Sequence, residues 1–208
     1  QRLNKHTARV ACQTCHIPEF ARKLPTKMNW DWSKAGDTTR KESTHEYLKI
    51  KGEFQYEEGV VPTYAWFNGR MDRYVIGDVL DSETEHNMNH PIGSRDDRKA
   101  KIWPFKVHHA TQPYDMVNNI IIPPLTSGEG GYWTKFDWKY AVETGARLNN
   151  LPYSGKFGFT PTKMYWPITH MVTTSKNALT CTDCHSSGGR LNWLELGYKN
   201  DPVQGPQK

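Results

Sequence analysis

The chain has 208 residues, enough for one large domain or two small ones, and a net charge of +5 from 27 basic and 22 acidic residues. No Lys or Arg run is long enough to favour nucleic-acid binding, and no stretch is long and apolar enough to span a bilayer. Hydrophobic residues make up only 36%, but the 12% of aromatic residues is untypical of a disordered chain. The composition predicts a folded chain that packs around a large apolar group it does not encode. We expect one unit over residues 1–208, with no internal boundary.

The first third of the chain predicts short elements. "LNKHTARVACQTCHIPEFARK" indicates a helical turn that Pro18 closes, and "TKMNWDWSKAGD" a tryptophan-bearing loop. "YLKIKGEFQYEEGVVPTYAWFNGR" alternates polar and apolar residues around Gly52 and Gly59, which favours a short hairpin.

The rest of the chain offers one clear helix. "RYVIGDVLD" is compatible with a strand or a buried loop, whereas Lys135 to Leu151 has apolar residues near helical spacing and is followed by Pro152. Gly, Pro, Asn and Asp recur at short intervals, so long elements should be few. We expect a fold that is mainly α with much irregular loop and little β.

All four cysteines lie in two Cys-x-x-Cys-His motifs, at Cys12, Cys15 and His16 and at Cys181, Cys184 and His185. This motif attaches a c-type haem. Its two thiols form thioethers to the porphyrin, and the adjacent histidine binds the iron from one face. The sequence therefore predicts two covalent haems, with His16 and His185 as proximal ligands.

Two other chemistries use paired cysteines. A Cys-x-x-Cys redox dithiol needs no cofactor, and a four-cysteine zinc site usually spaces its pairs by about 15–20 residues. Here the pairs lie near opposite ends of the chain, and neither chemistry requires a histidine after both pairs.

The remaining histidines exceed the two distal positions that two haems offer; they are His6, His45, His86, His90, His108, His109 and His170. His170 stands in the aromatic and aliphatic setting of "MYWPITHMV" and is the first candidate ligand. The tether from His6 to Cys12 is short, so His6 should serve a neighbouring haem rather than its own. His108 is favoured over His109, and His90 or His86 is a further candidate. Methionine is the alternative axial ligand, at Met71, Met88, Met164 or Met171, but we expect bis-histidine ligation.

The sequence resembles the octahaem tetrathionate reductase family of multihaem c-type cytochromes. The similarity is carried, in order, by "HTARVACQTCHIPEFARKLPTKMNWDWSKAGD", "YAWFNGR", "IWPFKVHHATQPYD" and "WPITHMV…ALTCTDCHSSGGRLNWLELGY". It covers nearly the whole chain but only the C-terminal half of the family's length. The resemblance implies haem attachment by both motifs, and distal ligation at His170, His108 and His6. It also implies a largely helical, loop-rich fold. Six of the family's eight motifs, and its lysine-ligated substrate haem, have no counterpart here, so no catalytic residue is carried over.

We therefore expect electron transfer through c-type haems, in contact with other haem-bearing segments or redox partner proteins. One alternative is the C-terminal portion of a reductase of tetrathionate, nitrite or hydroxylamine whose active haem lies elsewhere. Another is a subunit of an extracellular cytochrome filament. The resemblance implies a periplasmic or extracellular location, and a chain that starts at Gln1 suggests a processed product or part of a longer polypeptide.

Overall fold

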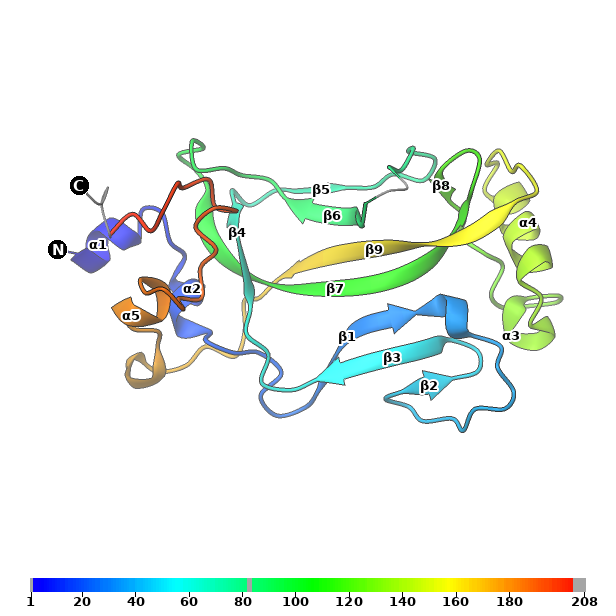
Figure 1. Ribbon diagram of the computed structural model, residues 1–208, viewed down its shortest axis with the longest axis horizontal. Coiled ribbons are helices and arrows are strands. Elements are labelled where there is room, and N and C mark those ends of the chain that lie inside the picture. Colours follow the sequence, from blue (N-terminus) through cyan, green and yellow to red (C-terminus); the bar gives the residue numbers. More distant parts are fainter. Residues whose placement is uncertain (1, 82–83, 204–208) are drawn as a thin grey trace.

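A long antiparallel pair of strands runs through the middle of the computed structural model, which describes residues 2–81 and 84–203 (Figure 1). Strand β7 (Lys101–Asp115) pairs with β9 (Phe157–Pro167) in one continuous register. On β7 the side chains of Ile102, Phe105 and Val107 are buried. This pair is long enough to connect the two ends of the molecule.

The other strands extend this pair into a mixed sheet. They are β1 (Thr26–Asp31), β2 (Tyr47–Leu48), β3 (Gly52–Glu57), β4 (Thr63–Phe67), β5 (Met71–Arg73), β6 (His86–Pro91) and β8 (Ile120–Ile121). Within the described residues, nine strands form one sheet in the order β2–β3–β1–β7–β9–β6–β5, and β4 and β8 pair with opposite ends of β7. The β1–β7 and β6–β9 pairs are parallel, and the others are antiparallel.

The expected fold class, mainly α with little β, is wrong, because 30% of the chain is strand and only 17% is helix. Prolines within β7 and β9 obscured the two longest strands, since proline cannot donate to a strand ladder and is rare in central strands. Pro104 and Pro113 still take part in hydrogen bonding through their carbonyl groups. These accept from the backbone N–H of Ile168 at 3.0 Å and of Ile122 at 3.2 Å.

The helices lie at the two ends of the sheet (Figure 1). At one end are α1 (Arg2–His6), α2 (Cys12–His16) and α5 (Cys181–Cys184), and at the other are α3 (Tyr132–Lys135) and α4 (Trp138–Leu148). Among the described residues, two 3-10 turns complete the set, η1 (Trp32–Lys34) and η2 (Ser175–Asn177). The helix predicted near Lys135–Leu151 is confirmed as α4. It begins at Trp138 because the Asp137 side chain caps it, accepting the N–H of Tyr140 at 3.0 Å.

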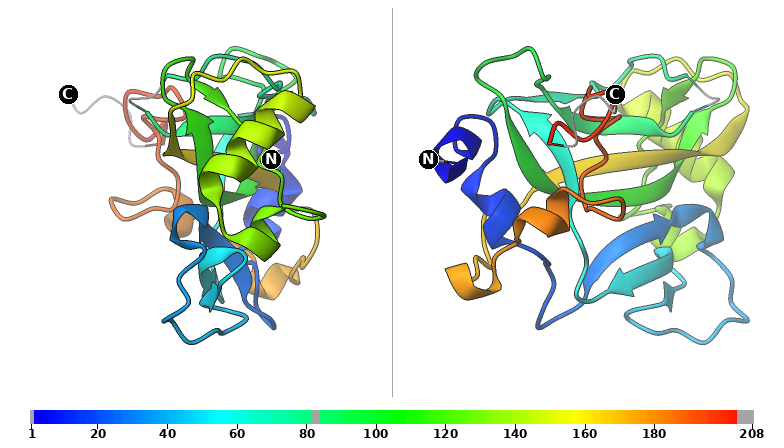
Figure 2. Two further views of the ribbon diagram at one scale, coloured as in Figure 1. Left: turned by 90° about the vertical axis from the view of Figure 1, so that its right-hand side faces the viewer. Right: turned by 60° about the vertical axis from the view of Figure 1, so that its left-hand side comes forward.

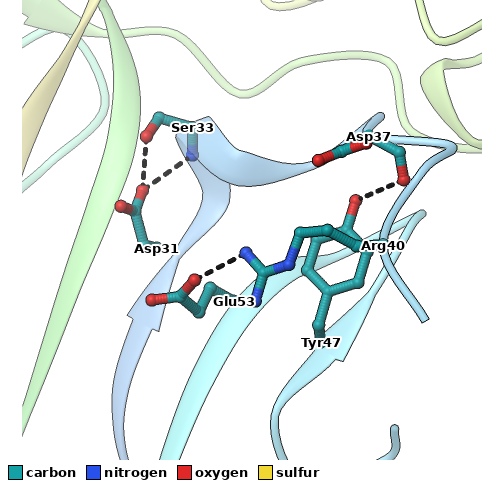
Figure 3. Close-up of polar contacts among 6 residues, drawn as sticks. All are labelled: Asp31, Ser33, Asp37, Arg40, Tyr47 and Glu53. Carbon is teal, nitrogen blue, oxygen red and sulfur yellow. Dashed lines mark hydrogen bonds and ion pairs between the residues drawn. The ribbon is translucent and has the colours of Figure 1, made fainter. Parts of the chain in front are cut away.

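The predicted tryptophan loop is wrong in its first half, which forms β1. The chain then turns at Asp31, whose Oδ1 accepts the N–H of Ser33 at 3.0 Å (Figure 3). An ion pair between Arg40 and Glu53 at 2.6 Å ties the following loop to β3. The Tyr47 hydroxyl adds a hydrogen bond to the carbonyl of Asp37 at 2.9 Å (Figure 3).

The hairpin prediction is confirmed at only one of its two glycines. Strands β2 and β3 pair antiparallel at Gly52, which has a φ of +89° and a backbone so close to Asp31 that no Cβ would fit. At Gly59 no hairpin forms, because β4 leaves β3 to pair with β7. The segment "RYVIGDVLD" is mostly an exposed loop, with Val75, Ile76 and Val79 facing solvent.

Buried apolar side chains form separate clusters rather than one core. Among the described residues, one cluster joins β4 and β7 to the C-terminal segment through Trp66, Ile102, Cys184 and Leu196. A second surrounds Ile17 and Ile168, and a third packs α4 against Ile120 and Ile122. The first two clusters lie beside the Cys-x-x-Cys-His motifs, and the third lies at the opposite end.

Candidate functional site

The two Cys-x-x-Cys-His motifs meet at one end of the sheet (Figures 1 and 2). The backbone N–H of Leu179 donates to the carbonyl of Cys15 at 2.9 Å. The guanidinium of Arg190, just beyond the second motif, donates to the carbonyl of Pro18, just beyond the first. Residues from opposite ends of the sequence therefore form one site.

Helix α2 is fixed to the start of β7 through the second variable residue of its motif. Thr14 is fully buried, and its hydroxyl donates to the carbonyl of Ile102 at 2.7 Å. The N–H of Ala11 donates to the same carbonyl at 3.0 Å. With Thr14 turned inward, Cys12 is exposed and Cys15 is partly buried. The Cys12 thiol thus lies on the outer side of a firmly attached turn, and Cys15 is partly covered.

Helix α5 is held by its own cap and by the first apolar cluster. The backbone N–H of Thr180 donates to Asp183 Oδ2 at 2.7 Å, and the Thr180 side chain accepts a hydrogen bond from the backbone N–H of Asp183. These two reciprocal hydrogen bonds make a capping box. Cys184 is buried in the cluster around Trp66, whereas Cys181 is exposed. Each motif therefore offers one exposed and one more buried thiol.

The environment of the thiols disfavours chemistry that needs free thiolates. Burial, and then the neighbouring cysteines, raise the pKa of Cys15, and burial raises the pKa of Cys184 to about 11. A redox dithiol requires a thiolate near neutral pH. Within residues 2–81 and 84–203, no cluster of three or more His, Cys, Asp or Glu residues is arranged to hold a metal ion.

Both motif histidines have one ring nitrogen engaged by the protein. His16 Nδ1 lies 3.2 Å from the carbonyl oxygen of Thr173, and His185 Nδ1 lies 2.7 Å from Asp201 Oδ1. The His185 ring also stacks on Trp193, with ring centres 5.0 Å apart. An acceptor at Nδ1 fixes the tautomer in which Nε2 is free to bind a metal. The residues present therefore fit a haem iron at each motif.

The family is decided by comparison with known proteins. The family described as bacterial cytochrome c matches residues 27–188. The chain belongs to this family. The structure is similar to the octaheme cytochrome c from Shewanella oneidensis, with a TM-score of 0.93 and 47% sequence identity, over 100% of this chain and 50% of that one. The chain thus spans half the length of that cytochrome. A search of curated proteins gave no match.

Membership of the bacterial cytochrome c family implies covalently bound haem c. When bound, the haem supplies an iron that changes between ferric and ferrous. The protein orients the axial histidines and sets the polarity around the iron. No helix among the described residues is long and apolar enough to cross a membrane.

The predicted distal histidines lie in three different settings. The ring centre of His6 on α1 is 6.2 Å from that of His185. His170 is exposed at a pocket of about 480 Å³, close to the Thr173 carbonyl that meets His16. His108 on β7 and His90 on β6 lie within the sheet. Since a strand advances about 3.3 Å per residue, His108 lies on the order of 20 Å along β7 from Ile102, where the first motif attaches.

His108 lies in the sheet, in surroundings that favour the neutral form of its imidazole. Burial, with the charges of Lys106, Lys27 and His109, lowers its pKa to about 4. Its Nε2 is buried and has no hydrogen-bond partner among the described residues. His109 differs, because its Nδ1 contacts Glu85 Oε1 at 2.5 Å. An acceptor at Nδ1 leaves Nε2 of His109 able to bind a metal, as in the two motif histidines, so these surroundings do not separate His108 from His109 and the preference for His108 stays a prediction.

The groups that hold the two motif histidines are not among the residues that the sequence predicts for the site. Thr173 acts through its backbone carbonyl, which no side-chain pattern reveals. Asp201 and Trp193 follow the second motif closely enough to be considered, but their spacing matches no recognised motif. Their roles depend on the fold of the segment after α5.

Proposed function

We propose that both motifs attach haem, through Cys12 and Cys15 and through Cys181 and Cys184, and that electrons pass directly between these two haems. The observation that carries the proposal is the backbone contact between Leu179 and Cys15, which places the motifs side by side. Two irons bound by His16 and His185 at this junction would form one step of a haem relay.

His6 is the distal ligand that the geometry favours for the haem at Cys181–Cys184. Two imidazoles that bind one iron from opposite sides each place a nitrogen about 2 Å from the metal, so their ring centres lie roughly 6 Å apart. The rings of His6 and His185 are 6.2 Å apart. This also fits the sequence argument that His6 serves a haem other than the one beside it in the chain.

His170 is proposed as a distal ligand of a haem near this junction, because it lies exposed at the pocket of about 480 Å³ beside Phe20 and Ile168. His108 and His90 are proposed as ligands of haems attached outside this chain, because both lie away from the motifs. Further haem-bearing segments are consistent with the chain spanning half of the octaheme cytochrome c. The proposed partners are such segments and redox proteins.

At the level of the whole protein, we propose a member of the octahaem tetrathionate reductase family that works outside the cytoplasm. The order of the matching segments and the half-length match to an octaheme cytochrome support this proposal. Residues 1–208 would then form one haem-bearing unit, whose own contribution is electron transfer rather than substrate reduction.

The number and attachment of the haems are tested by intact mass under denaturing conditions, together with a pyridine haemochrome assay. We expect the polypeptide that contains this chain to carry one haem for each Cys-x-x-Cys-His motif. Replacing Cys181 and Cys184 with Ala should remove one haem, and replacing Cys12 and Cys15 should remove another. If neither pair of replacements changes the haem count, attachment at these motifs is refuted.

A further inference from the structure

The two motif histidines differ in the charge of the group at Nδ1. His16 meets the backbone carbonyl of Thr173 at 3.2 Å, which is a neutral acceptor. His185 meets Oδ1 of Asp201 at 2.7 Å, which is a carboxylate oxygen. Hydrogen bonds to an ionised acceptor are shorter and roughly twice as strong as neutral ones. The two proximal ligands are therefore electronically unequal although their motifs are the same.

The carboxylate of Asp201 is shielded from water. Its side chain is 6% exposed and that of His185 is 14% exposed. Asp201 Oδ1 also accepts the N–H of Val203 at 2.9 Å, and Oδ2 is buried without a partner among the described residues. No Lys or Arg of the described chain forms an ion pair with Asp201. Its negative charge is thus directed mainly at the His185 ring, in surroundings of low polarity.

We propose that Asp201 is a positioning residue that lowers the reduction potential of the haem at Cys181–Cys184 below that of the haem at Cys12–Cys15. This inference rests on the proposed function, because it requires both haems. A carboxylate at Nδ1 raises the basicity of the imidazole, and a more basic ligand stabilises ferric over ferrous iron. A neutral carbonyl at His16 has a weaker effect of the same kind.

The difference in reduction potential sets the direction of electron transfer between the two haems. One electron leaves the ferrous iron at His185, which becomes ferric, and reduces the ferric iron at His16 to ferrous. No covalent bond forms or breaks, and the proton on His185 Nδ1 stays in its hydrogen bond to Asp201. A reduced redox partner protein supplies the electron, and the next ferric haem of the relay accepts it.

The test is Asp201→Asn in the haem-loaded protein that contains this chain, with the potential of each haem measured by spectroelectrochemistry. Asparagine keeps the size of the side chain, and its Oδ1 can still accept from His185 and Val203, so His185 receives a neutral acceptor like that of His16. We expect the one-electron equilibrium of the His185 haem to shift at least tenfold towards ferrous, which is 59 mV. The reduction potential of the haem at His16 should change by less than this amount, so the reduction potentials of the two haems converge.

Asp183→Asn is the matched control. Asp183 lies within the second motif and carries the same charge, but its carboxylate caps α5 and has no contact with His185. If the effect passes through the hydrogen bond, Asp183→Asn should shift the same haem by much less than tenfold. Equal shifts in both variants would show a general charge effect and overturn the inference.

Haem counts separate this inference from the proposed function. If the haemochrome assay finds no haem at Cys181–Cys184 in the wild type, the proposed function fails. If both haems are present and Asp201→Asn leaves the His185 haem unshifted, or shifts only the other haem, the inference about Asp201 fails alone. Hyperfine-shifted NMR signals of the His185 ring identify which measured reduction potential belongs to the haem that His185 binds. Should Asp201→Asn not assemble, Asp201→Ser provides a neutral acceptor for the same comparison.

Discussion

At the residue scale, the junction of the motifs is built from side chains that each satisfy a specific requirement. Thr14 connects α2 to β7 through a fully buried hydroxyl, and Asp183 caps α5. His16 and His185 keep Nε2 available because Thr173 and Asp201 occupy Nδ1. The two contacts at Nδ1 set the orientation of both motif histidine rings.

Replacing His6 with Ala tests its proposed role as a distal ligand. Loss of an axial imidazole leaves one iron five-coordinate or water-bound, so a high-spin ferric signal should appear in low-temperature EPR and account for one haem. His45→Ala is the control, because His45 is exposed and contacts Tyr56 rather than a motif. An unchanged low-spin spectrum for His6→Ala would show that His6 is not an axial ligand.

At the element scale, β7 links the end of the molecule that carries the two Cys-x-x-Cys-His motifs to the end that carries α3 and α4. Its first residues contact α2, and its last residue, Asp115, organises the opposite turn. Asp115 is fully buried and accepts hydrogen bonds from the N–H groups of Val117, Asn118 and Ser154, at 2.8, 2.8 and 2.6 Å. Burial alone would raise its pKa, but these hydrogen bonds outweigh burial and lower it.

Asp115→Asn should therefore reduce the free energy of unfolding at pH 7 by about 1–3 kcal/mol, because an amide cannot accept all of these bonds. A lowered folded-state pKa means that the stabilisation is present above the unfolded value of about 3.9 and is lost as the pH falls through the folded value. The difference between variant and wild type should accordingly shrink as the pH falls below about 4. Urea unfolding at several pH values measures it.

Asp96→Asn is the control for the Asp115 prediction. Asp96 is exposed, so its replacement should change the free energy of unfolding by less than about 0.5 kcal/mol at every pH. If the free energy of unfolding of Asp115→Asn lies below that of the wild type by the same amount from pH 7 to pH 3, the role assigned to the ionised Asp115 carboxylate is contradicted.

At the scale of the whole molecule, the apolar interior is divided between two ends. The cluster with Trp66, Ile102, Cys184 and Leu196 lies at the motifs, and the cluster of Val142, Ala146, Ile120 and Ile122 lies under α4. Of these two ends, only the motif end would gain apolar surface from haem attached to this chain. The motif end is therefore the part of the molecule whose apolar burial depends most on bound haem.

Hydrogen exchange of the haem-free chain should reveal this division. Without haem, we expect amides of residues 179–201 and of α2 to lose at least tenfold in protection, while β8 and α4 keep theirs. Local unfolding follows the regions with the fewest buried apolar contacts. The haem-loaded protein is the reference, and a uniform loss of protection over the whole chain would contradict the prediction.

The sequence by itself determined the chemistry, because haem attachment depends on a local pattern of cysteines and histidine that needs no tertiary information. It also located α4, whose apolar spacing and following proline are local signals. Tertiary structure alone decided the sheet. The strands β7 and β9 contain prolines and polar residues, and they are stabilised by pairing between residues far apart in the chain. The same long-range folding brings Leu179 to Cys15, His6 to His185 and Asp201 to His185. Spacing along the chain could not show these contacts, because each depends on where the sheet places both of its ends.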